Sequence, residues 1–236
     1  MVFKPKDNDW SYYYEVAESD KDLQWNTIFR KHLGWRCIGG QKNRLLSGVK
    51  RTTAALARLF GNDIQLFSMD VVLDFACGHG RIGEKFSALA HELILCDIRK
   101  EAIEFCRQRF HDRPKNCRYT FLVNTDDTIP LPDSSVSFLY SWDAMVHFER
   151  QDLEPYLSEF SRILRKQGCG FIHHSNYGSL NDGERKEWRE NPHWRANVSA
   201  SDVKDMCEEQ GLVVVKQELL DWGVEQLDCI TVFRKL

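Results

Sequence analysis

The sequence predicts an α/β protein with one open, seven-stranded sheet, mostly parallel but antiparallel at its last strand, preceded by a helical extension. From residue 70 onward, apolar runs typical of strands alternate with stretches of helical periodicity, which favours parallel strands joined by helices. The final two runs are separated only by residues 221–225, too few for a parallel crossover. We therefore expect an antiparallel hairpin at the end of the chain.

The individual elements follow from these patterns in chain order. In 150–166, for example, the apolar residues fall on one helical face. The expected strands are 70–75, 92–97, 117–123, 135–141, 168–174, 212–219 and 226–234, and the expected helices are 81–90, 99–110, 150–166 and 200–210.

Two segments stand outside this alternation. Residues 1–66 are rich in aromatic side chains, and 43–60 have helical periodicity, so we expect a helical lid over a domain formed by 67–236. Residues 176–199 mix Trp, Arg, Asn and Gly, which is too polar for a core and too aromatic for a plain linker.

The composition limits the classes of protein. With 236 residues and 42% hydrophobic content, the chain can bury one sizeable core. A net charge of -3 argues against nucleic acid as a partner. Eight cysteines without a Cys-x-x-Cys pair, no apolar leader and no apolar run of about 18 residues predict a cytoplasmic protein without a membrane span.

The most informative motif is the segment 71–83, an apolar strand that ends on Asp74 and turns through glycines into a helix. Gly78 and Gly80 allow a tight turn and close approach of a nucleotide-like ligand. A carboxylate before that turn repels a pyrophosphate and favours a positively charged ligand such as S-adenosylmethionine. Asp97, at the end of the next strand, is placed to accept hydrogen bonds from a ribose diol. The alternative, a tight turn beside an exposed acid, requires these features to coincide by accident.

With these residues, 66–236 resemble the class I S-adenosylmethionine-dependent methyltransferases, which have a Rossmann-like sheet. The resemblance implies that Asp74 and the loop hold the methionine part and that Asp97 holds the ribose. It also implies that 124–126 contact the adenine, with Ile98 as its apolar floor unless that side chain is ordinary core. The expected cofactor-binding residues are Asp74, Ala76, Cys77, Gly78, His79, Gly80, Asp97, Ile98, Asn124, Thr125, Asp126, Ser141 and Trp142.

Candidate catalytic groups follow the fourth and fifth strands, whose carboxyl ends face the ligand crevice in such sheets. Methyl transfer to a hydroxyl benefits from a general base, and Asp143 and His147 are the candidates, with His174 as base or orienter. Alternatively, Asp143 caps a following helix and His147 is a hydrogen-bonded core histidine. One of His173 and His174 should point toward the crevice and the other away.

The stretches FIHHSNYG, SWDAMVHFE and WRANVSASDV resemble methyltransferases of glycan and polysaccharide biosynthesis. Aromatic rings and amide or guanidinium groups suit a sugar acceptor, and the candidates are Asn176, Tyr177, Trp194 and Arg195. Alternatively, this loop packs its tryptophans against the lid. Some sugar methyltransferases use magnesium with carboxylate ligands, so a metal is an open alternative. No acidic cluster suited to magnesium is evident, however, and we name no metal-binding residue.

The sequence thus predicts an S-adenosylmethionine-dependent methyltransferase that acts on a hydroxyl of a sugar or glycan. A small-molecule O- or N-methyltransferase of secondary metabolism is the alternative for the substrate. A nicotinamide-dependent oxidoreductase would share the glycine loop, although its fingerprint normally lacks an acid at Asp74. A non-catalytic S-adenosylmethionine-binding partner subunit is the remaining alternative.

Overall fold

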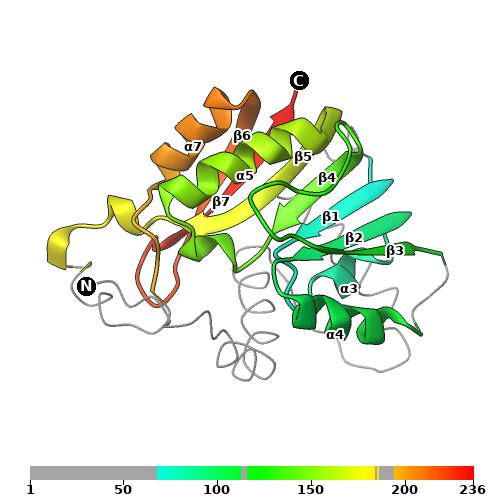
Figure 1. Ribbon diagram of the computed structural model, residues 1–236. Coiled ribbons are helices and arrows are strands. Elements are labelled where there is room, and N and C mark those ends of the chain that lie inside the picture. Colours follow the sequence, from blue (N-terminus) through cyan, green and yellow to red (C-terminus); the bar gives the residue numbers. More distant parts are fainter. Residues whose placement is uncertain (1–67, 113–115, 184, 186–193) are drawn as a thin grey trace, which may run out of the picture.

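A computed structural model describes residues 68–112, 116–183, 185 and 194–236 (Figure 1). The expected lid 1–66, with its helix 43–60, lies outside these residues and stays a prediction. The described elements are β1 (Val71–Phe75), α3 (Gly83–Phe86), β2 (Glu92–Asp97), α4 (Lys100–Phe110), β3 (Arg118–Val123), β4 (Val136–Ser141), η4 (Met145–His147), α5 (Arg150–Ile163), β5 (Leu164–Ser175), η5 (Tyr177–Ser179), α7 (Ala200–Glu209), β6 (Leu212–Leu220) and β7 (Asp228–Lys235).

The strands form one seven-stranded sheet in the order β3-β2-β1-β4-β5-β7-β6. Strands β1 to β5 pair in parallel, whereas β7 runs antiparallel to both β5 and β6. The prediction of a mostly parallel sheet that ends in an antiparallel hairpin is confirmed. In Figure 1 the carboxyl ends of the parallel strands gather at one edge of the sheet, and the chain terminus after β7 lies at the opposite edge.

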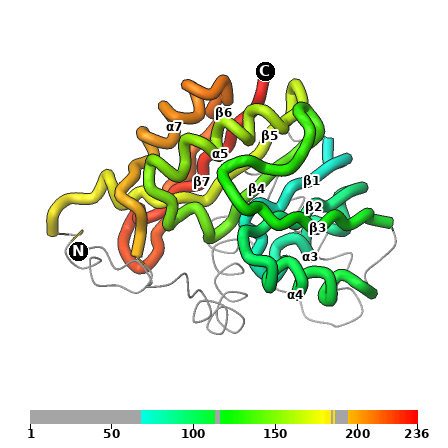
Figure 2. The backbone as a smooth tube through the Cα atoms, in the orientation of Figure 1, coloured from blue at the N-terminus to red at the C-terminus, as the bar shows by residue number. Residues whose placement is uncertain are grey.

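Helices cover the sheet from both sides, with α3 and α4 on one face and α5 and α7 on the other (Figures 1 and 2). Alternate strand residues supply the two cores. On the α3 side, Tyr140 stacks between Phe86 and Phe171, with ring centroids 4.2 and 5.7 Å apart. On the α5 side, Phe75 packs edge-on against Phe160. Because both faces are buried, the central strands are apolar without clear alternation.

Several element boundaries differ from the sequence prediction, among them those of the first helix, α5 and β5. The first helix spans only Gly83–Phe86 instead of 81–90, since the Ser87 hydroxyl donates to the Glu84 carbonyl and competes with the helical pattern. Strand β5 begins directly after α5, at Leu164 rather than at residue 168. The pairing with β4 shifts between Val136 and Phe138, so the first part of β5 is irregular.

The helices on the α5 side have well-defined beginnings. The Asp152 carboxylate accepts the Glu149 N–H at 3.0 Å at the start of α5. At the start of α7, Ser199 and Asp202 form a reciprocal capping box, with bonds of 2.8 and 3.1 Å. These caps fix the helices that cover the sheet beside the edge where the parallel strands end.

Candidate functional site

The glycine loop, defined as Ala76–Gly80, follows β1 and is shaped by left-handed backbone conformations. Ala76, Gly78 and Gly80 have φ values of 55°, 53° and 69°. A Cβ atom on Gly80 would lie 2.6 Å from Phe110 Cε2, so no larger side chain fits there. The Cys77 N–H donates to the Cys96 carbonyl at 3.0 Å, which ties the loop to the end of β2. The loop therefore presents main chain, rather than side chains, to the edge of the sheet.

Asp97 ends β2 and organises this loop with both carboxylate oxygens. Oδ2 accepts the Gly78 N–H at 2.8 Å, and Oδ1 accepts the Arg99 N–H at 2.9 Å. Burial raises the pKa of Asp97, and the two N–H donors oppose that shift. A carboxylate has about four acceptor positions, so Asp97 can still accept hydrogen bonds from a ligand.

Asp74, near the end of β1, is a buried acid with an unsatisfied carboxylate oxygen. Its side chain is 2% exposed, and Oδ2 has no hydrogen-bond partner among the described residues. Burial raises its pKa to about 8, although the nearby Tyr140 hydroxyl and the Gly83 backbone lower it; neither reaches hydrogen-bonding geometry with Oδ2. A cationic ligand would stabilise the ionised form. The residues present therefore fit the ammonium or sulfonium of S-adenosylmethionine.

The segment after β3 lies at the next position along the edge. Asn124 is buried, and its amide donates to the Tyr156 hydroxyl at 3.1 Å, while Oδ1 has no partner among the described residues. Thr125 and Asp126 are exposed, and Asp126 accepts the Thr128 N–H through its side chain. Ile98 is 64% exposed, so the alternative that it is ordinary core is wrong. An exposed apolar side chain here suits the floor of an adenine site.

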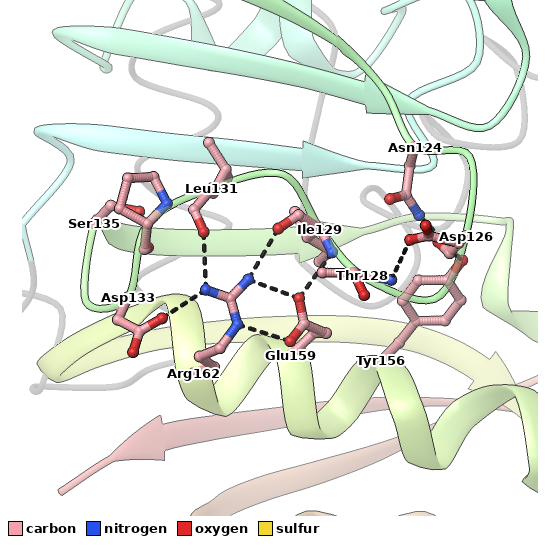
Figure 3. Close-up of polar contacts among 11 residues, drawn as sticks. Asn124, Asp126, Thr128, Ile129, Leu131, Asp133, Ser135, Tyr156, Glu159 and Arg162 are labelled. Atoms are coloured by element: carbon pink, nitrogen blue, oxygen red, sulfur yellow. Dashed lines mark hydrogen bonds and ion pairs between the residues drawn. The ribbon is translucent and has the colours of Figure 1, made fainter.

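Arg162 on α5 holds the loop that continues from this segment, which we call the Arg162 clasp (Figure 3). The guanidinium donates to the carbonyls of Ile129 and Leu131 at 2.9 and 2.8 Å and to Asp133 at 2.7 Å. It also pairs with Glu159, which in turn accepts the Ile129 N–H at 2.8 Å. One side chain thereby fixes the main chain between β3 and β4.

A second group of residues, the histidine network, comprises Asp143, His173, Arg195 and Asp228. Asp143 follows β4 with a φ of 58°, and its N–H donates to His173 Nδ1 at 3.2 Å. His173 Nε2 lies 3.2 Å from Asp228 Oδ2, and Arg195 binds both Asp228 oxygens at 2.6 and 2.9 Å. Burial would raise the pKa of Asp228, but Arg195 and His173 outweigh it and hold that pKa at about 2.

Aromatic rings line the histidine network. The centroid of the Trp142 ring lies 4.6 Å from that of His173. The ring centroid of Trp222, in the β6–β7 hairpin, lies 5.5 Å from that of His173. Arg195 lies over the Trp222 ring at 5.6 Å. Trp222 is half-buried, so part of its surface is accessible beside the network. Trp142, predicted to bind cofactor, therefore packs against the network that begins at Asp143.

His174 lies away from this arrangement, and the prediction that it acts as base or orienter needs correction. It is fully buried, with Nδ1 2.8 Å from the Ser175 carbonyl and Nε2 2.7 Å from the Thr231 hydroxyl. Burial lowers its pKa to about 4. Because adjacent strand residues face opposite ways, it is His173 that contacts Asp143.

Asp143 and His147 do not share the face of an α-helix as the sequence suggested. The turn between them is the short 3₁₀ helix Met145–His147, capped by Ala144 without a side-chain hydrogen bond, so Asp143 is not its N-cap. The His147 ring lies 5.0 Å from the ring of Trp194. His147 therefore lies beside a core tryptophan rather than in the histidine network.

The predicted sugar-binding residues are mostly committed to the protein itself. Trp194 is 6% exposed and packs in the core on the α5 side, although its Nε1 has no partner among the described residues. The Asn176 amide donates to the Gln226 carbonyl at 2.8 Å and accepts the Ala200 N–H at 2.8 Å. Tyr177 donates to the Arg185 carbonyl at 3.1 Å. Together with the pairing of Arg195, these contacts favour structural roles. At the end of β4, the buried hydroxyls of Tyr140 and Ser141 have no hydrogen-bond partner among the described residues.

Sequence reasoning missed the roles of His173, Asp228, Trp222 and Arg162. Asp228 carried one usable signal, since it is an acid within the apolar run LDCITVF, and a buried acid requires a partner. Nothing local indicated which residue that partner would be.

Metal ligands and membrane-spanning helices were the remaining subjects of the sequence predictions. Among the described residues, no group of three or more His, Cys, Asp or Glu side chains is arranged to hold a metal ion. Within the same part of the chain, no helix has the length and apolar character needed to cross a membrane.

Comparison with known proteins finds similarity to methyltransferases over part of this chain. Residues 72–168 match the family described as "Methyltransferase domain". A malonyl-[acyl-carrier protein] O-methyltransferase from Yersinia pestis is 30% identical over 112 residues, which cover 48% of this chain and 39% of that protein. This chain thus matches about two fifths of the length of that relative.

Solved structures share the fold at low sequence identity. The PH0226 protein from Pyrococcus horikoshii OT3 superposes with a TM-score of 0.57 at 18% identity and covers 90% of this chain and 99% of its own. A SAM-dependent methyltransferase from Methanosarcina mazei gives 0.60 at 14% identity, covering 74% and 97%. These structures show the fold of this domain, and the family match shows that residues 72–168 are similar to a methyltransferase domain.

Proposed function

We propose that this chain is an O-methyltransferase that uses S-adenosylmethionine to methylate a hydroxyl oxygen, with a sugar or glycan as the acceptor. Bound at the glycine loop, the cofactor supplies a sulfonium methyl group. Asp74 offers a carboxylate for its positive charge, and Asp97 accepts hydrogen bonds from the ribose. The O-methyltransferase from Yersinia pestis supports an oxygen acceptor.

We choose a neutral acceptor because of how the buried charges near the end of β4 are paired. Arg195 is the one buried arginine or lysine side chain among the described residues, and Asp228 already binds it through both oxygens. The Arg195 guanidinium is therefore already neutralised by Asp228 and is not held ready for an acceptor carboxylate. A hydroxyl needs no such partner, but its high pKa calls for a base, the role proposed for Asp143, with His147 as the second candidate.

A sugar acceptor is supported by the rings beside the histidine network. Trp222 is half-buried and Trp142 lies against His173, so flat apolar faces adjoin polar groups there. Sugars combine C–H patches, which pack on aromatic rings, with hydroxyls, which need polar partners. A small-molecule hydroxyl or amine acceptor of secondary metabolism is the alternative. We include a cytoplasmic location in the proposal because the seven cysteines of the described part are free thiols.

Methyl-labelled S-adenosylmethionine tests this proposal directly. The full chain is incubated with sugars, nucleotide sugars, glycans, small carboxylates and amines, and the labelled atom in each product is identified by mass spectrometry. We expect label on a hydroxyl oxygen and a decrease in kcat of about a hundredfold or more in Asp143→Asn. Asp205→Asn, an exposed substitution on α7, is the matched control.

Two results would overturn the proposal. Label found only on nitrogen excludes hydroxyl methylation, and label found only on carboxylates excludes the neutral acceptor. Calorimetry with S-adenosylmethionine and with its demethylated product provides the prior test, since a chain that binds neither is no methyltransferase.

A further inference from the structure

Asp143 has a main-chain conformation that the surrounding structure must hold in place. Its φ of 58° lies in the left-handed region, which a non-glycine residue adopts only at an energetic cost. No side-chain cap of the following 3₁₀ helix stabilises this turn. The Asp143 N–H instead donates to His173 Nδ1, on the neighbouring strand β5. The position of the proposed base thus depends on His173.

The direction of the hydrogen bonds sets the state of the His173 ring. A main-chain N–H is a donor only, so Nδ1 accepts and carries no proton. The ring proton is then on Nε2, from which it is donated to Asp228 Oδ2. His173 is therefore neutral, in a single tautomer selected by Asp143 on one side and Asp228 on the other.

Asp228 is in turn held as an acceptor by Arg195. The two-point contact orients the carboxylate, and the segment around Arg195 is tied to the same region by the Ala196 N–H, which donates to the Val146 carbonyl at 3.0 Å. The Ser175 hydroxyl, at the end of β5, donates to the Ala196 carbonyl at 2.7 Å. Buried ion pairs add little net stability over apolar packing. The contribution of the Asp228–Arg195 pair is instead to fix the orientation of the Asp228 carboxylate.

We propose that His173 is a positioning residue for the methyl-transfer reaction, which holds Asp143 at the carboxyl edge of the sheet through the Asp143 main-chain N–H and is itself fixed by the Asp228–Arg195 pair. This inference rests on the proposed function for its catalytic meaning. The hydrogen-bond geometry on which it depends can be measured without any acceptor.

Two substitutions of His173 test its Nδ1 and Nε2 contacts separately. In His173→Asn the amide oxygen can take the place of Nδ1 and accept the Asp143 N–H, whereas contact with Asp228 is lost. In His173→Gln the longer amide can take the place of Nε2 and keep Asp228, whereas the acceptor for Asp143 is lost. If His173 positions Asp143, the two variants must differ, while a purely structural role would make the variant that breaks the Asp228 contact the worse one in every measurement.

The experiment combines three measurements on the full chain. Nitrogen NMR of wild-type protein should show an unprotonated Nδ1 and a protonated Nε2 at His173. Amide hydrogen exchange at Asp143 should be slow in wild type and His173→Asn, and at least tenfold faster in His173→Gln. The kcat for methyl transfer should fall at least tenfold further in His173→Gln than in His173→Asn, with S-adenosylmethionine affinity unchanged within about twofold in both.

Several outcomes overturn the inference. A proton on Nδ1 in the wild-type spectrum contradicts the hydrogen-bond assignment even if both variants fail to fold. Equal exchange at Asp143 in the two variants, or a greater loss of kcat in His173→Asn, excludes positioning through the N–H. If wild type methylates no acceptor, the proposed function fails, whereas the spectrum and the exchange rates still decide whether His173 holds Asp143.

Discussion

The glycine loop and the histidine network occupy neighbouring stretches of the same sheet edge but are built differently. The loop is held by main-chain groups around one carboxylate, Asp97, and its shape depends on glycines. The network is held by side chains, with a buried ion pair at its base. A main-chain loop suits a ligand whose shape does not vary, and a side-chain network can change with the acceptor. We infer that the glycine loop is characteristic of the class of protein and that the histidine network is characteristic of its substrate.

The two halves also differ in how their charge is balanced. Asp228 is paired with Arg195 and has a pKa of about 2. Asp74 has no hydrogen-bond partner for Oδ2 in the described part, and its pKa is about 8. Asp228 therefore stabilises the folded chain without ligand, whereas ionised Asp74 requires a cationic ligand as its partner. Substitutions at these two positions should have opposite effects on stability.

The largest effect is expected from Asp228→Asn, which leaves Arg195 buried without its counter-charge. Breaking a buried ion pair on one side costs about 3–5 kcal/mol, so the free energy of unfolding in urea should fall by that amount at neutral pH. The double variant Asp228→Asn with Arg195→Met should recover part of the loss, because it removes the unpaired cation. A loss below about 1 kcal/mol would contradict the ion pair.

The same pair gives a pH dependence with a defined sign. The pKa of Asp228 is about 2 in the folded chain and 3.8 in a model compound, so the folded state favours the ionised form. Its contribution to stability is fully present above about pH 5 and is lost as the pH falls toward about 2. The difference in unfolding free energy between wild type and Asp228→Asn should shrink over that window.

The next largest effect is expected from Asp97→Asn, on the side of the glycine loop. An amide offers one oxygen acceptor, so one of the N–H groups of Gly78 and Arg99 loses its partner. Hydrogen bonds to a charged group contribute about 1.5–3 kcal/mol, so S-adenosylmethionine should bind about tenfold to a hundredfold more weakly by calorimetry. Asp205→Asn, exposed on α7, should leave the affinity unchanged. An unchanged affinity in Asp97→Asn would show that the loop does not hold the cofactor.

Asp74→Asn should produce a smaller change, visible in the pH dependence of binding. With a pKa of about 8, Asp74 is largely protonated at pH 7 and must lose its proton to pair with a cation. Wild-type affinity should therefore rise several-fold from about pH 6 to pH 9, and Asp74→Asn should lack this rise. The ammonium of the ligand titrates in both proteins, so the difference between them reports Asp74.

Stability provides the control for Asp74, because the sign is opposite to that for Asp228. The pKa is raised from 3.8 to about 8, so the folded state retains a proton that the unfolded chain loses, and stability falls as the pH rises between those values. Ligand-free Asp74→Asn should thus unfold at a higher temperature than wild type near pH 8. A lower melting temperature would mean that the ionised carboxylate has a partner without ligand.

The difference between the halves explains what the sequence could predict. The glycine loop and Asp97 are short-range features whose residue types are dictated by backbone geometry, so the sequence could predict the glycine turn and the sheet that contains it. The network joins Asp143 to His173 and His173 to Asp228 across 30 and 55 residues, and such pairing depends on strand order. The choice between His173 and His174 depends on register. Both faces of β5 are buried, so no alternation of polarity marks which histidine faces which side.

The smallest effect is expected from Arg162→Lys. This substitution tests whether the main chain between β3 and β4 is held independently of the glycine loop and of the histidine network. One ammonium cannot reproduce the contacts of the Arg162 clasp with two carbonyls, Asp133 and Glu159 (Figure 3). About 1–2 kcal/mol of unfolding free energy should be lost, and cofactor affinity should fall only about twofold, through the segment beginning at Asn124. Arg165→Lys is the matched control, because the half-buried Arg165 side chain lies 3.7 Å from Asp70 and not in the Arg162 clasp. A tenfold loss of affinity would mean that this loop holds the cofactor as firmly as Asp97 does, and that main-chain control extends beyond the glycine loop.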